Sequence, residues 1–121
     1  MTAVLWAGVA VLGGVGAVLR FLVDGAVSAR LGRSFPYGTL IVNLSGALVL
    51  GLLTGLSLGH EESLLAGTAV VGSYTTFSTW MFETQRLGED RQVPLLVANL
   101  GVSLVAGVLA AAAGRWIGLR L

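Results

Sequence analysis

The sequence predicts an all-α membrane protein with one domain (residues 1–121) and four transmembrane helices. Apolar residues make up 55% of the chain and charged residues only 11%, against about 25% charged residues in a typical soluble domain. Mean hydropathy is +0.89. Four blocks carry no charge, namely 1–19, 34–60, 63–82 and 92–114, and each approaches the roughly 20 residues that a spanning helix needs.

The four helices are expected near residues 4–28, 36–58, 63–86 and 93–118. The first block is predicted to span the membrane and not to be a secretory signal, because no basic residue precedes it and its apolar run continues to Leu19. Short turns at 32–36, 59–62 and 88–91 join the helices. These turns leave no room for an extramembrane domain, so the function is expected within the bilayer.

Composition also excludes several classes of function. The chain has no cysteine and therefore neither disulfides nor thiolate metal sites. A net charge of +1 predicts no nucleic-acid partner. His60 stands alone in a turn, and no metal cluster or nucleophile–base pair is visible, so the chain is not expected to be an enzyme.

The arginines leave the orientation in the membrane open. All seven basic residues are arginines. With four spans, the side that holds both termini and the 59–62 turn carries Arg115 and Arg120, and the other side carries Arg30, Arg33, Arg86 and Arg91. This difference leans weakly toward the second side being cytoplasmic but is too small to fix one orientation. Either the chain inserts both ways and pairs with an inverted copy of itself, or it pairs with a partner chain of opposite bias. A two-fold dimer is the natural unit in both cases.

Polar side chains within the apolar blocks are the candidate functional residues. Asn43 forms either an interhelical hydrogen bond or an amide donor on an anion pathway. Arg20 either pairs with Asp24 at the i, i+4 spacing or attracts anions at a vestibule. Asn99 and Ser103 share one helix face, which is either a packing seam or a pore lining.

Residues 72–80 read Gly-Ser-Tyr-Thr-Thr-Phe-Ser-Thr-Trp and predict a break in the third helix. Glycine and β-branched or hydroxyl residues are poor helix formers. A break near the middle of the membrane would release backbone carbonyls, which favour a cation. Phe77 and Trp80 project from neighbouring points, and the positive edges of their rings suit a small anion.

Three motifs resemble those of the CrcB, or Fluc, fluoride channels, and the resemblance covers essentially the full chain. They are Gly-Gly-x-Gly-Ala-x-x-Arg-Phe at 13–21, Gly-Thr-Leu-Ile-Val-Asn-Leu-x-Gly at 38–46, and Gly-x-x-Thr-Thr-Phe-Ser-Thr at 72–79. The family forms antiparallel, dual-topology dimers with two fluoride pores. The resemblance therefore implies passive, selective fluoride permeation, with fluoride export and resistance, in the bacterial inner (plasma) membrane.

The resemblance also assigns roles to individual residues. Asn43 would contact fluoride in the pore, and Phe77 would be the first of two pore phenylalanines. Gly72 and Thr75 would offer backbone carbonyls to a structural, non-transported sodium ion at the dimer interface. The remaining residues implied are Arg20 at the vestibule, Ser103 on a polar track of hydroxyls, and Thr79 as a possible member of that track.

Two positions depart from the family pattern. Trp80 stands where the second pore phenylalanine usually lies, and Asn99 stands where the fourth helix often has tyrosine. The departures fit either ordinary variation in a homodimer or a non-conducting or partner-dependent subunit of a heterodimer. A small proton-coupled multidrug exporter is a weaker alternative, because it needs a carboxylate deep in the membrane. The first acidic residue is Asp24, near the end of the first helix, and the others lie at turns or at Glu83.

Overall fold

The computed structural model describes residues 2–121, and within them it contains helices and no strand. The all-α prediction is therefore confirmed. In chain order the elements are α1 (Ala3–Leu31), α2 (Tyr37–Leu56), α3 (His60–Ser63), the π-helix η1 (Leu64–Val71), α4 (Gly72–Tyr74), α5 (Ser78–Glu89) and α6 (Val93–Arg120).

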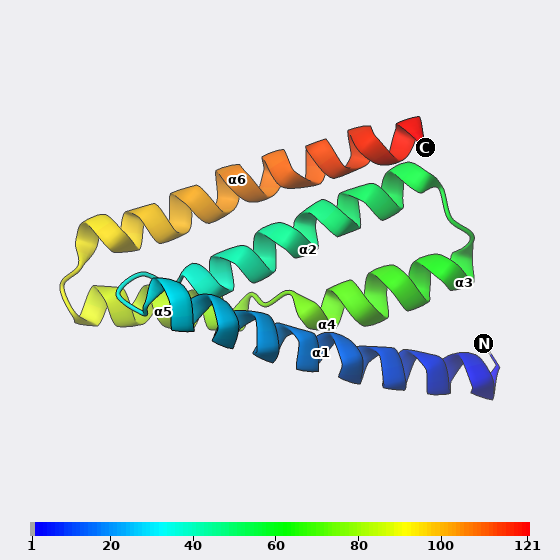
Figure 1. Ribbon diagram of the computed structural model, residues 1–121, viewed down its shortest axis with the longest axis horizontal. Coiled ribbons are helices and arrows are strands. Elements are labelled where there is room, and N and C mark those ends of the chain that lie inside the picture. Colours follow the sequence, from blue (N-terminus) through cyan, green and yellow to red (C-terminus); the bar gives the residue numbers. More distant parts are fainter. Residues whose placement is uncertain (1) are drawn as a thin grey trace.

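The elements form an elongated bundle with lengthwise helices (Figure 1). The start of α1, the end of α6 and the α2–α3 connection lie at one end of the bundle, and the α1–α2 and α5–α6 connections lie at the other. Helix α2 packs along α6, while α1 packs against α2, η1 and α4. The chain thus passes along the bundle four times.

Three helices are long and apolar enough to cross a membrane, and they match three of the predicted spans. They are α1, α2 and α6, with mean hydropathies of 1.9, 1.9 and 2.2. Helix α1 begins after Thr2, whose hydroxyl accepts a hydrogen bond from the Leu5 N–H at 3.1 Å, a typical N-cap. It ends at Gly32, whose φ of +81° suits glycine.

Small residues bring α2 and α6 together. A Cβ at Gly51 would collide with the Ala111 carbonyl, and one at Gly114 would lie 2.9 Å from the Leu52 nitrogen. Close approach through small residues is how helices pack within a membrane. At Gly101 and Gly107, however, a Cβ would meet nothing within 4 Å. These two α6 glycines therefore make no close contact within this chain.

The predicted third helix, near 63–86, is divided in the structure into α3, η1, α4 and α5. Hydroxyl side chains on either side of the end of α4 bond back to the main chain: Ser73 Oγ donates to the Ala69 carbonyl at 2.6 Å, and Thr75 Oγ1 donates to the Val71 carbonyl at 3.0 Å. Such bonds compete with the helical pattern. Thr75 is extended (φ −78°, ψ 159°), and α5 starts at Ser78.

Candidate ion pathway

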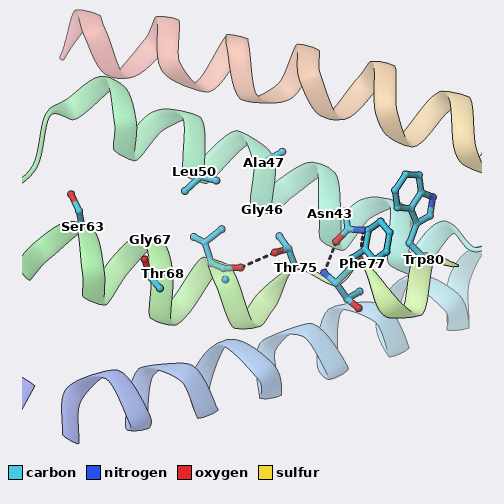
Figure 2. Close-up of a pocket in the computed structure, with 13 residues that line it drawn as sticks. Asn43, Gly46, Ala47, Leu50, Ser63, Gly67, Thr68, Thr75, Phe77 and Trp80 are labelled. Atoms are coloured by element: carbon cyan, nitrogen blue, oxygen red, sulfur yellow. Dashed lines mark hydrogen bonds between the residues drawn. The ribbon is translucent and has the colours of Figure 1, made fainter. Parts of the chain in front are cut away.

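A groove of about 680 Å³ lies between α2 and the chain from Ser63 to Trp80. Figure 2 shows its apolar part around Leu50 and Ala47 and its polar part around Asn43. Much of the predicted site is brought together in this groove, which is lined by Asn43, Gly72, Thr75, Phe77 and Trp80.

The Asn43 side chain forms hydrogen bonds with the main chain between the end of α4 and the start of α5 (Figure 2). Its Nδ2 donates to the Thr76 carbonyl at 2.8 Å, and its Oδ1 accepts from the Thr76 N–H at 2.8 Å. The amide therefore forms the interhelical hydrogen bond that was one of its two predicted roles. Because an amide nitrogen carries two N–H groups and this pair engages one, Asn43 keeps a second donor at the groove wall.

Thr76 is a residue that the sequence analysis missed. Its side chain is only 8% exposed, and its Oγ1 accepts the Thr79 N–H at 3.1 Å. That contact caps the start of α5 in the manner of an N-cap hydroxyl. A threonine just before a helical segment is the sequence signal for such a cap. Thr76 thus supports the start of α5.

The two aromatic residues of the groove form an edge-to-face pair. The ring centroids of Phe77 and Trp80 lie 5.8 Å apart, with an interplanar angle of 81°. Phe77 is 70% exposed, while Trp80 is half-buried. Ring edges carry partial positive charge, so this pair can present a weak electrostatic attraction to an anion without a formal charge.

Trp80 and Asn99, the two departures from the family pattern, contact each other. The Trp80 Nε1–H donates to the Asn99 carbonyl of α6 at 3.1 Å. The Asn99 side chain is 1% exposed, and its Nδ2 donates to Thr84 Oγ1 at 2.8 Å. Thr84 Oγ1 in turn donates to the Trp80 carbonyl at 2.8 Å. Asn99 therefore lies in the α5–α6 contact and is not among the residues that line the groove.

A second, smaller cavity of about 180 Å³ holds two more of the predicted residues. Arg20 and Thr79 line it together with Asp24, Thr39 and Thr76. Thr76 lines both cavities, so the Asn43–Thr76 pair lies in the wall between them. The Asp24 carboxylate accepts a hydrogen bond from Ser28 Oγ at 3.3 Å. Arginine, carboxylate and hydroxyls make this cavity polar, unlike most of the groove.

The remaining predicted positions are less enclosed. Ser103 is partly exposed on α6 and lines neither cavity of this chain, so its role stays a prediction. Within residues 2–121, no three His, Asp or Glu side chains are grouped to hold a metal ion. A cation at the groove would therefore be bound by main-chain or hydroxyl oxygens. Gly72 and Thr75 at the groove wall each have a main-chain carbonyl, and Thr75 also has a hydroxyl.

Comparison with known proteins identifies a family and several similar chains. The family model described as CrcB-like protein, Camphor Resistance (CrcB), matches residues 7–115. A protein named fluoride-specific ion channel FluC 2 from Mycobacterium bovis is 60% identical over 117 residues, which is 97% of this chain and 93% of the relative. The FluC 2 of Mycolicibacterium paratuberculosis is 63% identical over 114 residues, covering 94% of this chain and 93% of the relative.

A more distant relative extends the comparison. A protein named fluoride-specific ion channel FluC 1 from Leifsonia xyli subsp. xyli is 42% identical over 123 residues, covering 98% of this chain and 89% of the relative. All three relatives are named as channels and not as enzymes. The apolar helices and these matches confirm the prediction of a multi-pass bacterial membrane protein. The chain therefore belongs to the CrcB family, the family of these fluoride-specific ion channels.

Proposed function

We propose that this chain forms a fluoride-selective channel that lets fluoride leave the cell passively and so confers fluoride resistance. The names of its relatives support this proposal. The observation that carries it is the convergence of the Asn43 amide with the Phe77–Trp80 pair on one groove that no formally charged side chain lines. Such a groove can attract a small anion without binding it so tightly that it cannot leave.

Fluoride is small and strongly hydrated, so a pore must replace its water shell. The second Asn43 N–H, the hydroxyls of Thr79 and Ser103, and the edge of the Phe77 ring are the donors proposed for this purpose. Arg20, in the second cavity, would raise the local concentration of anions at the entrance. Chloride is larger, and a narrow path with donors placed for fluoride would fit it poorly.

The four passes of the chain would all lie in the bilayer. In this proposal α3, η1, α4 and α5 together form the third, broken transmembrane helix, beside the three helices that are long and apolar enough to span on their own. Non-helical backbone at membrane depth is tolerated where it is buried in protein or lines a cavity. The bonds from Asn43 to Thr76 satisfy that condition for the main chain between α4 and α5.

The working unit is proposed to be an antiparallel, dual-topology dimer. Phe77 is 70% exposed at the groove, and in this proposal a second subunit covers it and closes the groove. The second subunit is either an inverted copy of this chain or a homologous partner chain. The numbered names FluC 1 and FluC 2 of its relatives are consistent with the partner-dependent alternative, in which two homologous chains pair.

A structural, non-transported sodium ion is the proposed cofactor of the dimer. Carbonyls near a helix end lack helical partners, and α4 ends at Tyr74, between Gly72 and Thr75. The extended backbone of Thr75 takes its carbonyl out of the helical direction. Two such carbonyls from each subunit would give the hard oxygen ligands that a small cation prefers. Bound there, sodium would supply a fixed positive charge that holds the two subunits together.

The first test is fluoride efflux from liposomes that contain only this chain, recorded with a fluoride electrode and with chloride as the control ion. We expect fluoride-selective efflux. The variant Phe77→Ile should abolish it and leave the dimer intact, whereas Phe82→Ile, a matched change at a 66% exposed residue of α5 outside the groove, should retain it.

Each other result has a defined meaning. Full flux in Phe77→Ile would contradict the assignment of the pore. An absence of flux from well-folded chain alone, restored when a homologous chain is co-expressed, would favour the partner-dependent subunit. Efflux that follows a proton gradient instead of dissipating the fluoride gradient would favour the exporter.

A further inference from the structure

We propose that Thr84 and Asn99 are positioning residues that hold the Trp80 indole with its N–H directed away from the groove, and that this orientation contributes to the selectivity for fluoride over larger anions. The inference rests on the proposed function, because it specifies how one wall of the same groove is built. It concerns contacts between α5 and α6 that lie behind the groove.

Three hydrogen bonds connect the three residues in a ring. The Trp80 Nε1–H donates to the main-chain carbonyl of Asn99, the Asn99 side-chain amide donates to Thr84 Oγ1, and the Thr84 hydroxyl donates to the main-chain carbonyl of Trp80. Two of these bonds are 2.8 Å and the third is 3.1 Å. The ring joins α5 to α6 at a point where Asn99 is almost wholly buried. No water competes for the amide there, so the bonds constrain the side chains strongly.

The ring of bonds determines what Trp80 can offer to an ion. Tryptophan has a single N–H donor and no acceptor. Because the Asn99 carbonyl engages that donor, the indole cannot give a hydrogen bond to an anion in the groove without leaving α6. What remains on the groove side is the aromatic system, packed nearly perpendicular to Phe77. Trp80 therefore acts as an apolar wall and a ring edge, not as a hydrogen-bond donor.

The same bonds prevent the indole from rotating. A side chain anchored at its N–H to a helix carbonyl has lost the freedom of both of its χ angles. A fixed indole keeps the Phe77 edge-to-face contact at 5.8 Å between centroids and so fixes the shape of this wall of the groove. A released indole would let both rings move and would admit an anion with a larger radius. Selectivity would fall more than fluoride conduction in that case.

Thr84 is the residue at which the anchor can be tested. Its hydroxyl accepts from the Asn99 side-chain amide and donates to the main-chain carbonyl of Trp80, so it acts on the indole through Asn99 and the α5 backbone, and it is not among the residues that line the groove. Thr84→Val keeps the shape of the side chain, removes both of these supporting bonds and leaves the indole N–H bonded to an Asn99 whose side chain is no longer held. Thr84→Ser keeps the hydroxyl and removes one methyl group. The pair therefore separates the loss of hydrogen bonding from a change of volume.

The experiment uses the full chain in lipid with Trp6→Phe and Trp116→Phe, which leaves Trp80 as the sole tryptophan of the three. In Thr84→Val, we expect lower fluorescence anisotropy of Trp80 and a shifted emission maximum. We also expect the fluoride-to-chloride efflux ratio to fall by about fivefold, the rate ratio that corresponds to one ordinary hydrogen bond. Thr84→Ser should restore all three readouts.

A double-mutant cycle shows whether Thr84 acts through Trp80. In the Trp80→Phe background, we expect Thr84→Val to leave the efflux ratio unchanged, because no indole remains to be held. An equal fall of the ratio in both backgrounds would overturn the proposal, as would unchanged anisotropy and ratio in Thr84→Val.

Two further measurements keep the test decisive. If Thr84→Val does not fold, hydrogen–deuterium exchange of the Trp80 indole N–H in the otherwise unchanged chain answers the same question. Slow exchange supports the anchor, and exchange as fast as that of exposed Trp6 and Trp116 overturns it. If the chain conducts no fluoride either alone or with a co-expressed homologous chain, the proposed function fails, while anisotropy and exchange still report on the anchor alone.

Discussion

Replacing Asn43 with leucine should destabilise the fold by removing the support of the main chain between α4 and α5. The side chains have similar size, so the groove keeps its volume. The change removes both hydrogen bonds to Thr76, each 2.8 Å long. The N–H and the carbonyl of Thr76 are then left without their side-chain partner, in a residue whose side chain is 8% exposed.

The expected magnitude follows from counting these groups. Each hydrogen bond contributes about 1 kcal/mol net, and each buried group left unpaired costs about 1–3 kcal/mol. Two bonds therefore give an upper range of about 2–6 kcal/mol. Thr76 borders two cavities that can admit water, and side-chain hydrogen bonds in membranes average only about 0.6 kcal/mol. We therefore expect a loss of about 2 kcal/mol, or about 30-fold in the ratio of folded to unfolded protein.

The assay is reversible unfolding in mixed lipid–detergent micelles, followed by circular dichroism. The matched control is Ser45→Ala, which lies on the same helix and removes a hydroxyl that shares a 2.9 Å hydrogen bond with Tyr74 and donates within its own helix to the Val42 carbonyl at 3.0 Å. This control should lose about 0.6 kcal/mol. The reasoning is refuted if Asn43→Leu unfolds at the same denaturant concentration as Ser45→Ala, because the two bonds to Thr76 would then contribute nothing of their own.

Three other predictions concern packing, the cation and the groove wall. Gly114→Ala should destabilise the chain, because its Cβ would lie 2.9 Å from the Leu52 nitrogen, whereas Gly107→Ala, with nothing within 4 Å of its Cβ, should not. Thermal unfolding followed by circular dichroism compares the two variants, and equal unfolding midpoints would contradict the packing argument. Replacing sodium by a large organic cation should lower both the thermal stability of the dimer, measured by size-exclusion chromatography after heating, and the fluoride efflux, measured with the fluoride electrode. An unchanged dimer would argue against the proposed sodium ion. Gly46→Ala should reduce both folding yield and fluoride flux, because its Cβ would collide with Thr75 Cγ2 and approach Tyr74 Cδ2 to 3.4 Å. Wild-type yield and flux in this variant would show that the chain around Tyr74 and Thr75 can move away from α2.

The long helices were predictable because hydropathy alone determines them. Charge-free blocks of sufficient length gave α1, α2 and α6, and glycine 32 marked the end of the first. The π-helical winding of Leu64–Val71 was not predictable, because it depends on tertiary contacts. A Cβ at Gly16 of α1 would collide with Ser73 and the Val70 carbonyl, and this close approach is invisible in local sequence.

The site was predictable where residue type reveals chemistry and not where the main chain carries it. The amide of Asn43 and the ring of Phe77 are recognisable from sequence, and the structure places both at one groove. The pairing of Asn43 with the Thr76 backbone leaves no trace in residue identity. Asn99 was placed on the correct face with Ser103, but α5 covers that face at Asn99 and leaves Ser103 partly exposed.

The π-helix has a consequence for insertions and deletions. Its hydrogen bonds span one residue more than those of an α-helix, so η1 holds surplus chain relative to α-helical winding. Loss of Ala66 can be absorbed when η1 rewinds as an α-helix, and Thr75 and Phe77 stay in place. Helix α6 holds no such surplus residue, so loss of Val105 turns all later residues of α6 by about 100° about the helix axis. We expect the chain lacking Ala66 to fold and conduct and the chain lacking Val105 to do neither, so η1 is a part of this chain that tolerates the loss of one residue.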